Sequence, residues 1–300
     1  MTTVEQAAQD GDARTKNGDN ERHPERTTAM TQAKTAPQAK LILFDLDGTL
    51  YLDGVLFPGV KELISKIRQS SLDYGFLTNN SSIGPEAYYH KLCKLDLELS
   101  HRNVVTSCEA TSLMLKELQV GPEIYILGTQ EFRHYLESQG FIHSFDQAKA
   151  LLIGFDKELN FAKLTEATKL VLAGKPIYAS HPDQVCPGPF PDAGMLIEYF
   201  KAARPGTIIQ AIAGKPHHWL VDLICERFQV RPEEIIMVGD RVNTDMRFAQ
   251  NFGMRSILVL NGCPMPTLGD IKPTLILEHI HQLTEQFWPA KLGWCQEHRP

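Results

Sequence analysis

The sequence lacks any apolar run long enough to cross a lipid bilayer, and it lacks the apolar segment of a secretory signal peptide. A membrane-spanning helix needs roughly 20 consecutive apolar residues. We therefore expect no route to export, and we expect the cytoplasm as the location of the protein.

Cysteine pairs with metal-binding spacing are also absent. The six cysteines are widely scattered, without a CxxC pair or a matching histidine spacing, which predicts free thiols in a reducing compartment. The adjacent His217 and His218 have no cysteine close to them in the sequence, so the polar start of a helix is a better interpretation of this pair than a zinc site.

The sequence also lacks a surplus of basic residues. The formal net charge is -6 over 300 residues, whereas proteins that bind nucleic acids or membrane surfaces usually carry a basic face. We therefore expect no nucleic-acid partner and no membrane partner. A small molecule is the expected ligand.

Residues 1–39 contain almost nothing to bury and should form a disordered N-terminal tail, in which Met30 is a candidate translation start. From residue 40 onward, short apolar runs alternate with amphipathic segments, which is typical of a mostly parallel sheet with helices on both faces. The first set of expected strands covers 41–44, 74–77 and 104–106, and it resumes at 208–212, 235–238 and 256–260. A second set covers 124–127, 151–153 and 177–179.

Because the first set resumes after the second, the second set is interpreted as an inserted domain. The predicted organisation is a core domain formed by 40–108 and 209–290, an inserted α/β domain at 109–208, and a C-terminal tail at 291–300. The fold class is α/β, with a doubly wound, Rossmann-like parallel sheet.

The first expected strand ends in two carboxylates, Asp45 and Asp47. Unpaired carboxylates are costly beside a buried strand, so a cation or catalysis is the expected reason for them. An ordinary Asp-Gly turn is the alternative when this segment is taken alone. Three further polar segments also follow apolar runs along the chain, and they are Thr78–Asn80, Gly214–Pro216 and Gly239–Asp245. Their presence favours a functional site over an ordinary turn.

Ligands of open parallel sheets collect at the carboxyl ends of the strands, so we expect Asp45, Thr78 and Asp240 in one crevice. A carboxylate such as Asp45 can attack phosphorus, while Asp47, one strand period away, can act as the proton donor. Acidic oxygen ligands indicate Mg²⁺ as the cation.

Charge-compensating donors for a phosphoryl group are also present. Thr78 offers a hydroxyl, the turn through Asn79 offers backbone donors, and Lys215 offers a positive charge. Taken alone, Lys215 could be a solvated loop lysine, and Asp240 and Asp245 could cap a helix. Arg241 is expected to be a structural ion-pair partner.

On these residues the chain resembles the haloacid dehalogenase superfamily phosphatases, and more narrowly the NagD-like branch with a type C2 cap, whose members include nitrophenyl-phosphate, pyridoxal-phosphate and phosphoglycolate phosphatases. The similarity covers about residues 40–285. It depends on the aspartate pair, the TNNS stretch at 78–81, the segments 154–156 and 161–164, the GKP at 214–216 and the GDR-x-x-TD at 239–245.

The resemblance implies that Asp45 is the phosphorylated nucleophile and that Asp47 is the general acid and base. It implies that Mg²⁺ is held by the Asp45 carboxylate, the Asp47 backbone carbonyl and Asp240, with Asp245 close by. Thr78, Asn79 and Lys215 would bind the phosphoryl group, and the cap would read the leaving group. A homodimer through the cap is a further expectation.

Two positions depart from the branch. Asn243 stands where Asp is frequent, and His181 stands where Asn is frequent before Pro-Asp. His181 and Asp183 lie in the loop expected to face the substrate, with loop turn chemistry as the alternative. The substrate is thus left open among sugar phosphates, phosphoglycolate, pyridoxal phosphate and nucleotide-like esters.

The predicted function is a Mg²⁺-dependent phosphatase acting through an aspartyl-phosphate on a small phosphorylated metabolite. A phosphotransferase or mutase that uses the same intermediate stays open as an alternative. A dehalogenase needs neither Asp47 nor a metal. A regulator that binds a phosphorylated metabolite without turnover is the rival from another class.

Overall fold

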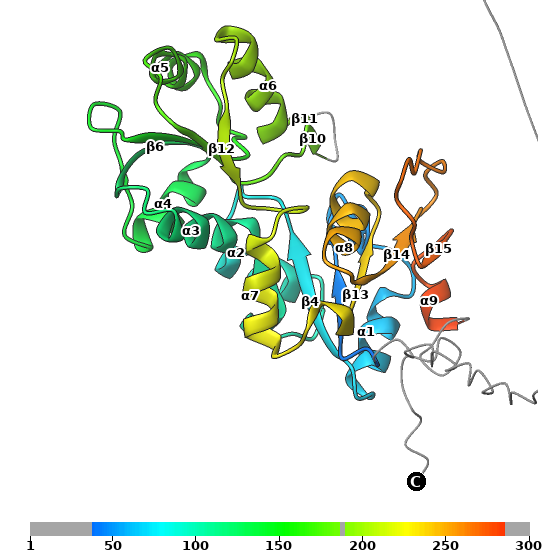
Figure 1. Ribbon diagram of the computed structural model, residues 1–300. Helices are drawn as coiled ribbons and strands as arrows, with labels where there is room; N and C mark the ends of the chain where they lie inside the picture. Colours follow the sequence, from blue (N-terminus) through cyan, green and yellow to red (C-terminus); the bar gives the residue numbers. More distant parts are fainter. Residues whose placement is uncertain (1–37, 187–189, 286–300) are drawn as a thin grey trace, which may run out of the picture. The chain divides into compact units, whose positions relative to one another are not determined.

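The first set of apolar runs forms one six-stranded sheet in the computed structural model (Figure 1). Its strands, in order across the sheet, are β15 (Leu275–Leu277), β14 (Arg255–Val259), β13 (Ile235–Gly239), β1 (Leu41–Phe44), β4 (Asp73–Thr78) and β5 (Val104–Thr106). Each neighbouring pair is parallel. The predicted α/β class with a parallel sheet is confirmed.

The structure describes residues 38–186 and 190–285, which belong to one compact unit, Ala36–Pro300. The predicted tails at 1–39 and 291–300 lie outside the described residues, except for the last two positions of the first. Ala39 is buried against the core. The packed chain therefore begins slightly before the predicted boundary.

Strand β1 lies at the point where the direction of winding changes. It pairs with β4 on one side and with β13 on the other. The chain first builds β4 and β5 on one side and later β13, β14 and β15 on the other. Such a switch point opens a crevice at the carboxyl ends of the central strands, where α/β proteins bind their ligands.

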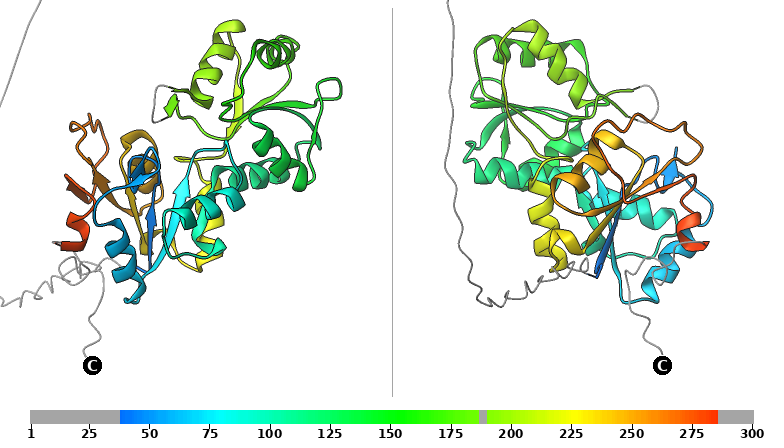
Figure 2. Two further views of the ribbon diagram at one scale, coloured as in Figure 1. Left: turned by 180° about the vertical axis from the view of Figure 1, so that it is seen from behind. Right: turned by 45° about the vertical axis from the view of Figure 1, so that its right-hand side comes forward.

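Helices cover both faces of this sheet because its strands are apolar on both sides (Figure 1, Figure 2). In β1, Leu41 and Leu43 belong to one buried cluster, whereas Ile42 and Phe44 belong to the other. The first cluster includes side chains of α3 (Ser107–Glu117), α7 (Trp219–Phe228) and α8 (Arg247–Asn251). The second includes side chains of α1 (Val60–Arg68), α2 (Pro85–Lys94) and α9 (Gln282–Glu285). Each fully buried aliphatic or aromatic side chain contributes about 1.5–3 kcal/mol.

A second, five-stranded parallel sheet is formed by β12 (Ile209–Ile212), β9 (Ile177–Ala179), β8 (Ala150–Ile153), β6 (Glu123–Leu127) and β7 (Ile142–His143), in this order. One of its faces packs against α5 (Phe161–Leu172) and α6 (Ala193–Ala203), and the other packs against α4 (Gln130–Ser138).

The prediction that the run 208–212 belongs to the first sheet is wrong. This run forms β12, which pairs with β9 at the edge of the second sheet. Its side chains are exposed or only partly buried. An apolar run predicts a strand, but it does not say which strand will pair with it.

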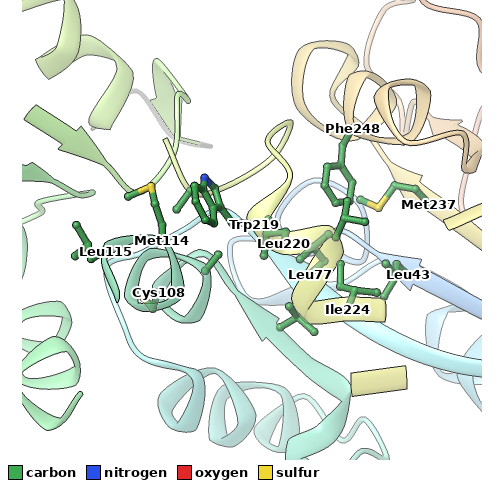
Figure 3. Close-up of a cluster of buried hydrophobic side chains, with 14 of the residues drawn as sticks. Leu43, Leu77, Cys108, Met114, Leu115, Trp219, Leu220, Ile224, Met237 and Phe248 are labelled. Atoms are coloured by element: carbon green, nitrogen blue, oxygen red, sulfur yellow. The ribbon is translucent and has the colours of Figure 1, made fainter. Parts of the chain in front are cut away.

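The two sheets share one hydrophobic cluster (Figure 3). Figure 3 shows Leu43 and Met237 from the first sheet in the same cluster as Met114 of α3 and Trp219 of α7. Ile124 and Ile126 of β6 also belong to it. The second sheet is therefore held against the helices of the first by buried apolar contacts.

The remaining elements are short. Two hairpins are formed by β2 (Tyr51–Leu52) with β3 (Val55–Leu56) and by β10 (Val185–Cys186) with β11 (Phe190–Pro191). The turns η1 (His101–Asn103) and η2 (Pro232–Glu234) are 3₁₀-helical, and η3 (Val242–Met246) is π-helical. The β2–β3 hairpin follows Asp47 directly, and η3 follows Asp240 closely.

Candidate active site

The polar residues at the ends of β1, β4 and β13 lie close together. Asp45 follows β1, Thr78 ends β4, and Asp240 follows β13. Asp45 and Thr78 line one pocket together with Lys215, and a carboxylate oxygen of Asp240 lies within 4.8 Å of one of Asp45. The structure therefore brings these four predicted residues into one region.

Lys215 is an almost fully buried lysine held between two carboxylates. Its Nζ donates to Oδ1 of Asp45 and to Oδ1 of Asp245, at 2.6 Å in each case. Burial by itself would lower the pKa of Lys215, but the two carboxylates raise it above its ordinary value. Lys215 is thus a fixed positive charge, and the interpretation as a solvated loop lysine is wrong because the side chain is only 1% exposed.

Three carboxylates form an acidic cluster around this lysine. Oxygens of Asp45, Asp240 and Asp245 all lie within 4.8 Å of one another. Burial, followed by the negative charges of Asp45 and Asp245, raises the pKa of Asp240 to about 8. Burial also raises the pKa of Asp245 to about 6, although Lys215 acts in the opposite direction.

The cluster fits a divalent cation because its negative charge exceeds the positive charge that Lys215 supplies. Hard cations such as Mg²⁺ take oxygen ligands. Gly48 leaves room beside Asp240, since a Cβ atom at this glycine would lie 2.5 Å from Asp240 Oδ2. Both oxygens of Asp245 already accept hydrogen bonds, one from Lys215 and the other from the backbone N–H of Arg241.

Asp47 has an environment different from that of Asp45. Its Oδ2 accepts from the hydroxyl of Tyr51 at 3.1 Å, and its Oδ1 lies 3.7 Å from Nζ of Lys91. Burial raises the pKa of Asp47, while Lys91 acts in the opposite direction. Asp45 is paired with a buried lysine, whereas the raised pKa of Asp47 favours its protonated form.

Asn79 holds two segments together with its side chain. Its Nδ2 donates to Oδ2 of Asp183 at 2.7 Å and to the backbone carbonyl of Lys215 at 3.0 Å. Its Oδ1 accepts from the backbone N–H of Lys215 at 2.7 Å. The amide therefore fixes the position of Lys215 while it lines the pocket.

The second sheet contributes Asp183 to the pocket. Its carboxylate accepts from Arg241 Nη1 at 2.9 Å and from Asn79. Burial by itself would raise the pKa of Asp183, but the nearby His181 and Arg241 and the bond from Asn79 hold it below its ordinary value. The prediction that Arg241 is an ion-pair partner is confirmed.

His181 does not line the pocket, although it was predicted to contact the substrate. Its ring is fully buried, with Nδ1 at 2.7 Å from Ser180 Oγ and Nε2 at 2.8 Å from Asp192 Oδ1. Asp192, in contrast, does line the pocket. The ring of His181 is packed behind the pocket wall, so it acts on a ligand indirectly, through Asp192, which it contacts, and through Asp183, whose pKa it lowers.

The sequence analysis missed several residues of the site. Asp192, Cys186 and Thr244 line the pocket, and Tyr51 and Lys91 contact Asp47. Asp192 precedes helix α6 as its N-terminal capping residue, so an acidic residue before an apolar helical segment was a usable signal. Lys91 gave no local signal, because its partners are far from it in the sequence.

Comparisons with known proteins identify the family. The family profile of haloacid dehalogenase-like hydrolases matches residues 42–142, and a HAD-hydrolase-like profile matches residues 212–283. An acid sugar phosphatase of Staphylococcus aureus is 30% identical over 239 residues, which cover 78% of this chain and 91% of that protein. The chain belongs to the haloacid dehalogenase-like hydrolases.

Other members of this hydrolase family are also similar. Human glycerol-3-phosphate phosphatase is 28% identical over 270 residues, which cover 77% of this chain and 81% of that protein. The crystal structure of a 4-nitrophenylphosphatase from Thermotoga maritima matches with a TM-score of 0.77 and 35% identity, covering 82% of this chain and 97% of that chain. These relatives are phosphatases, so the chain is assigned to the phosphoric monoester hydrolases, and the branch expected from the motifs is confirmed.

One further observation concerns membranes. Among residues 38–186 and 190–285, no helix combines the length and the apolar character that a membrane span requires.

Proposed function

We propose that this hydrolase is a Mg²⁺-dependent phosphatase that cleaves a small phosphorylated metabolite, with Asp45 as the nucleophile. The observation that carries the proposal is the buried contact between Lys215 and Asp45 inside a pocket at the switch point of the sheet. The contact with Lys215 holds one oxygen of Asp45 in place, and a carboxylate is a nucleophile that can attack phosphorus.

The two carboxylates of the motif would have different roles because their environments differ. Asp45 is held by Lys215, whereas burial favours the protonated form of Asp47. A pair of carboxyl groups with such a difference can provide one nucleophile and one proton donor. Asp47 would therefore be the general acid.

The reaction would proceed in two steps. An oxygen of Asp45 forms a bond to phosphorus while the bond from phosphorus to the leaving oxygen breaks, and Asp47 gives that oxygen its proton. Asp47, now a carboxylate, then takes a proton from the water that attacks the aspartyl-phosphate. The bond between phosphorus and Asp45 breaks, and inorganic phosphate leaves.

The pocket walls support the binding of a phosphoryl group. The pocket has a volume of about 40 Å³ and is lined by Thr78, Asn79 and Lys215. Asp45, Asp240 and the backbone carbonyl of Asp47 would hold Mg²⁺, with Asp245 beside them. When bound, the cation would neutralise charge on the phosphoryl oxygens.

The leaving group would extend beyond this small pocket. A second pocket, of about 810 Å³, shares Asp183, Arg241 and Thr244 with the first and continues along Pro182–Val185. Three relatives are named glycerol-3-phosphate phosphatase, acid sugar phosphatase and 4-nitrophenylphosphatase. These names support a small phosphate ester as the substrate of this chain.

The proposal is tested with purified protein and a panel of phosphate esters that includes 4-nitrophenyl phosphate, with Mg²⁺ and with EDTA. We expect turnover that requires the cation and that is lost in Asp45→Asn, because an amide is not a nucleophile for phosphorus. Asp146 is exposed in a loop of the second sheet, and the variant Asp146→Asn is the matched control. Wild-type activity in Asp45→Asn, or a wild type that hydrolyses no ester of the panel, would overturn the proposal.

A further inference from the structure

The carboxyl group of Asp47 is held by two side chains that the mechanism above does not use. The hydroxyl of Tyr51 donates to Asp47 Oδ2 at 3.1 Å. Nζ of Lys91 donates to the same hydroxyl at 2.8 Å and lies 3.7 Å from Asp47 Oδ1. The three polar groups form one connected chain beside the pocket.

Tyr51 is fixed by the fold immediately after the aspartate. The backbone N–H of Gly48 donates to the carbonyl of Tyr51, and Asp47 and Tyr51 form a β-bridge. The tyrosine side chain is fully buried and belongs to the hydrophobic cluster on the α1 and α2 face of the sheet. Its ring therefore has little freedom to move the hydroxyl.

Lys91 reaches this hydroxyl from helix α2. Its ammonium group lies 4.5 Å from the ring centre of Tyr51 and 5.4 Å from that of Tyr88. Cations are attracted to aromatic ring faces, and this attraction adds to the hydrogen bond. The ammonium group is thus held by two rings and one hydroxyl. Lys91 and Tyr51 are 40 residues apart in the sequence.

The arrangement fixes the direction of the hydrogen bonds. A lysine ammonium group can only donate, so the Tyr51 oxygen accepts from Lys91 and its own hydrogen is directed to Asp47. When a hydrogen bond holds one oxygen of a carboxyl group, the group cannot rotate freely. The direction of its other oxygen is therefore fixed as well.

We infer that Tyr51 and Lys91 are positioning residues for Asp47, which orient its carboxyl group for proton transfer to the leaving oxygen. The inference rests on the proposed function, because it requires Asp47 to act as the general acid. Neither residue touches the phosphoryl pocket, whose lining does not include them.

This role has a consequence that a purely structural role lacks. An alkyl ester leaves as a strongly basic alkoxide unless it is protonated, whereas 4-nitrophenolate is a stable anion that leaves without a proton. Loss of orientation at Asp47 should therefore slow the first step, departure of the leaving group, much more for alkyl phosphates than for 4-nitrophenyl phosphate. General acid catalysis contributes about 10²- to 10⁴-fold in total, and misorientation forfeits part of it.

The test compares kcat/KM of the wild type, Tyr51→Phe and Lys91→Met with Mg²⁺ for two substrates, because kcat/KM reports the steps up to the departure of the leaving group and not the later attack of water. The first is 4-nitrophenyl phosphate, and the second is whichever of glycerol 3-phosphate, phosphoglycolate and glucose 6-phosphate the wild type hydrolyses fastest. We expect kcat/KM for the alkyl ester to fall about 10- to 100-fold in both variants, while kcat/KM for 4-nitrophenyl phosphate falls less than about threefold. Lys91→Arg, which keeps the donor, should recover most of the alkyl activity.

The controls lie on the same helix. Tyr89→Phe and Lys94→Met change the same residue types in α2 without a contact to Asp47, and both should hydrolyse the two esters as the wild type does. Circular dichroism and the melting temperature report whether each variant is folded. Tyr51→Phe keeps the buried ring, and Lys91→Met provides a second variant that leaves the tyrosine intact.

Equal losses with both esters in the two variants would refute the positioning role and indicate a structural one. Unchanged alkyl activity in both variants would refute it as well. Either result would leave the proposed function intact, provided that the wild type is active and Asp45→Asn is not. A wild type that hydrolyses none of the esters would overturn the proposed function and this inference with it.

Discussion

Replacement of Lys215 by methionine is the change that should disturb this protein most. Lys215 is 1% exposed and donates to Asp45 and Asp245 at 2.6 Å each. Methionine has a similar length but no charge and no donor. The variant keeps the volume of the side chain while it removes the one buried cation that touches both carboxylates.

The expected loss of stability follows from the burial of these partners. Breaking a buried ion pair from one side costs about 3–5 kcal/mol, because a charge is left uncompensated. Two carboxylates lose their partner here, but the loss is not doubled, since burial already favours proton uptake by Asp245, whose pKa is about 6. For a protein of this size, about 3–5 kcal/mol corresponds to a fall in melting temperature of about 6–20 °C.

The assay is thermal unfolding at pH 7 with EDTA, combined with turnover of 4-nitrophenyl phosphate in Mg²⁺. Lys61→Met is the matched control, because Lys61 pairs with Asp96 on the surface, where the two side chains are 56% and 87% exposed. An exposed pair contributes little to stability, so the control should melt within a few degrees of the wild type. Turnover should fall about 10²- to 10³-fold in Lys215→Met only.

A Lys215→Met variant that melts with the Lys61→Met variant and keeps wild-type turnover would refute this reasoning. It would mean that the lysine is not required to balance the acidic cluster. A variant that melts early but keeps its turnover would refute the catalytic part alone.

Two further predictions concern the acidic cluster and the wall of the pocket. The pKa of Asp240 is about 8 in the folded protein against 3.8 in a solvated chain, so its contribution to stability is present at low pH and is lost as the pH rises through about 8. In EDTA the melting temperature should therefore fall between pH 5 and pH 8, and Mg²⁺ or the variant Asp240→Asn should reduce this fall; an equal fall in all three samples would contradict the prediction. His181→Asn should lower the free energy of unfolding by about 1–3 kcal/mol, because Asp192 loses its buried donor. The variant should also change KM more than kcat. Chemical denaturation measures the stability and steady-state assays measure KM, and wild-type values of both would contradict the expectation.

Much of the first sheet could be predicted from the sequence. The runs that form β1, β4 and β13 are apolar at nearly every position, which is typical of strands buried on both faces. Because ligands bind at the carboxyl ends of such strands, the positions of Asp45 and Asp240 followed from these runs. Lys215 was predicted only because its segment, Gly214–Pro216, accompanies the segments that contain Asp45 and Asp240.

Two helices escaped the sequence analysis. Helix α3 buries residues around most of its circumference, including Ser107, Thr111 and Met114, so it has no clear polar face to give a helical period. Helix α6 buries Ala193, Leu196, Ile197 and Phe200, which are spaced at a helical period, so its local pattern did hold a usable signal. For α3, the tertiary surroundings determine burial that the local pattern does not record.

The order and periodicity of nearby residues are enough to predict the fold class, the family and the residues that follow the central strands. Only the tertiary structure decided that β12 pairs with β9, that His181 is packed behind Asp192, and that Lys91 of α2 meets Tyr51 beside Asp47. The physical reason is the range of the interactions. A segment's own pattern states which of its faces must be buried, whereas the partner that buries it is selected by the packing of the whole chain.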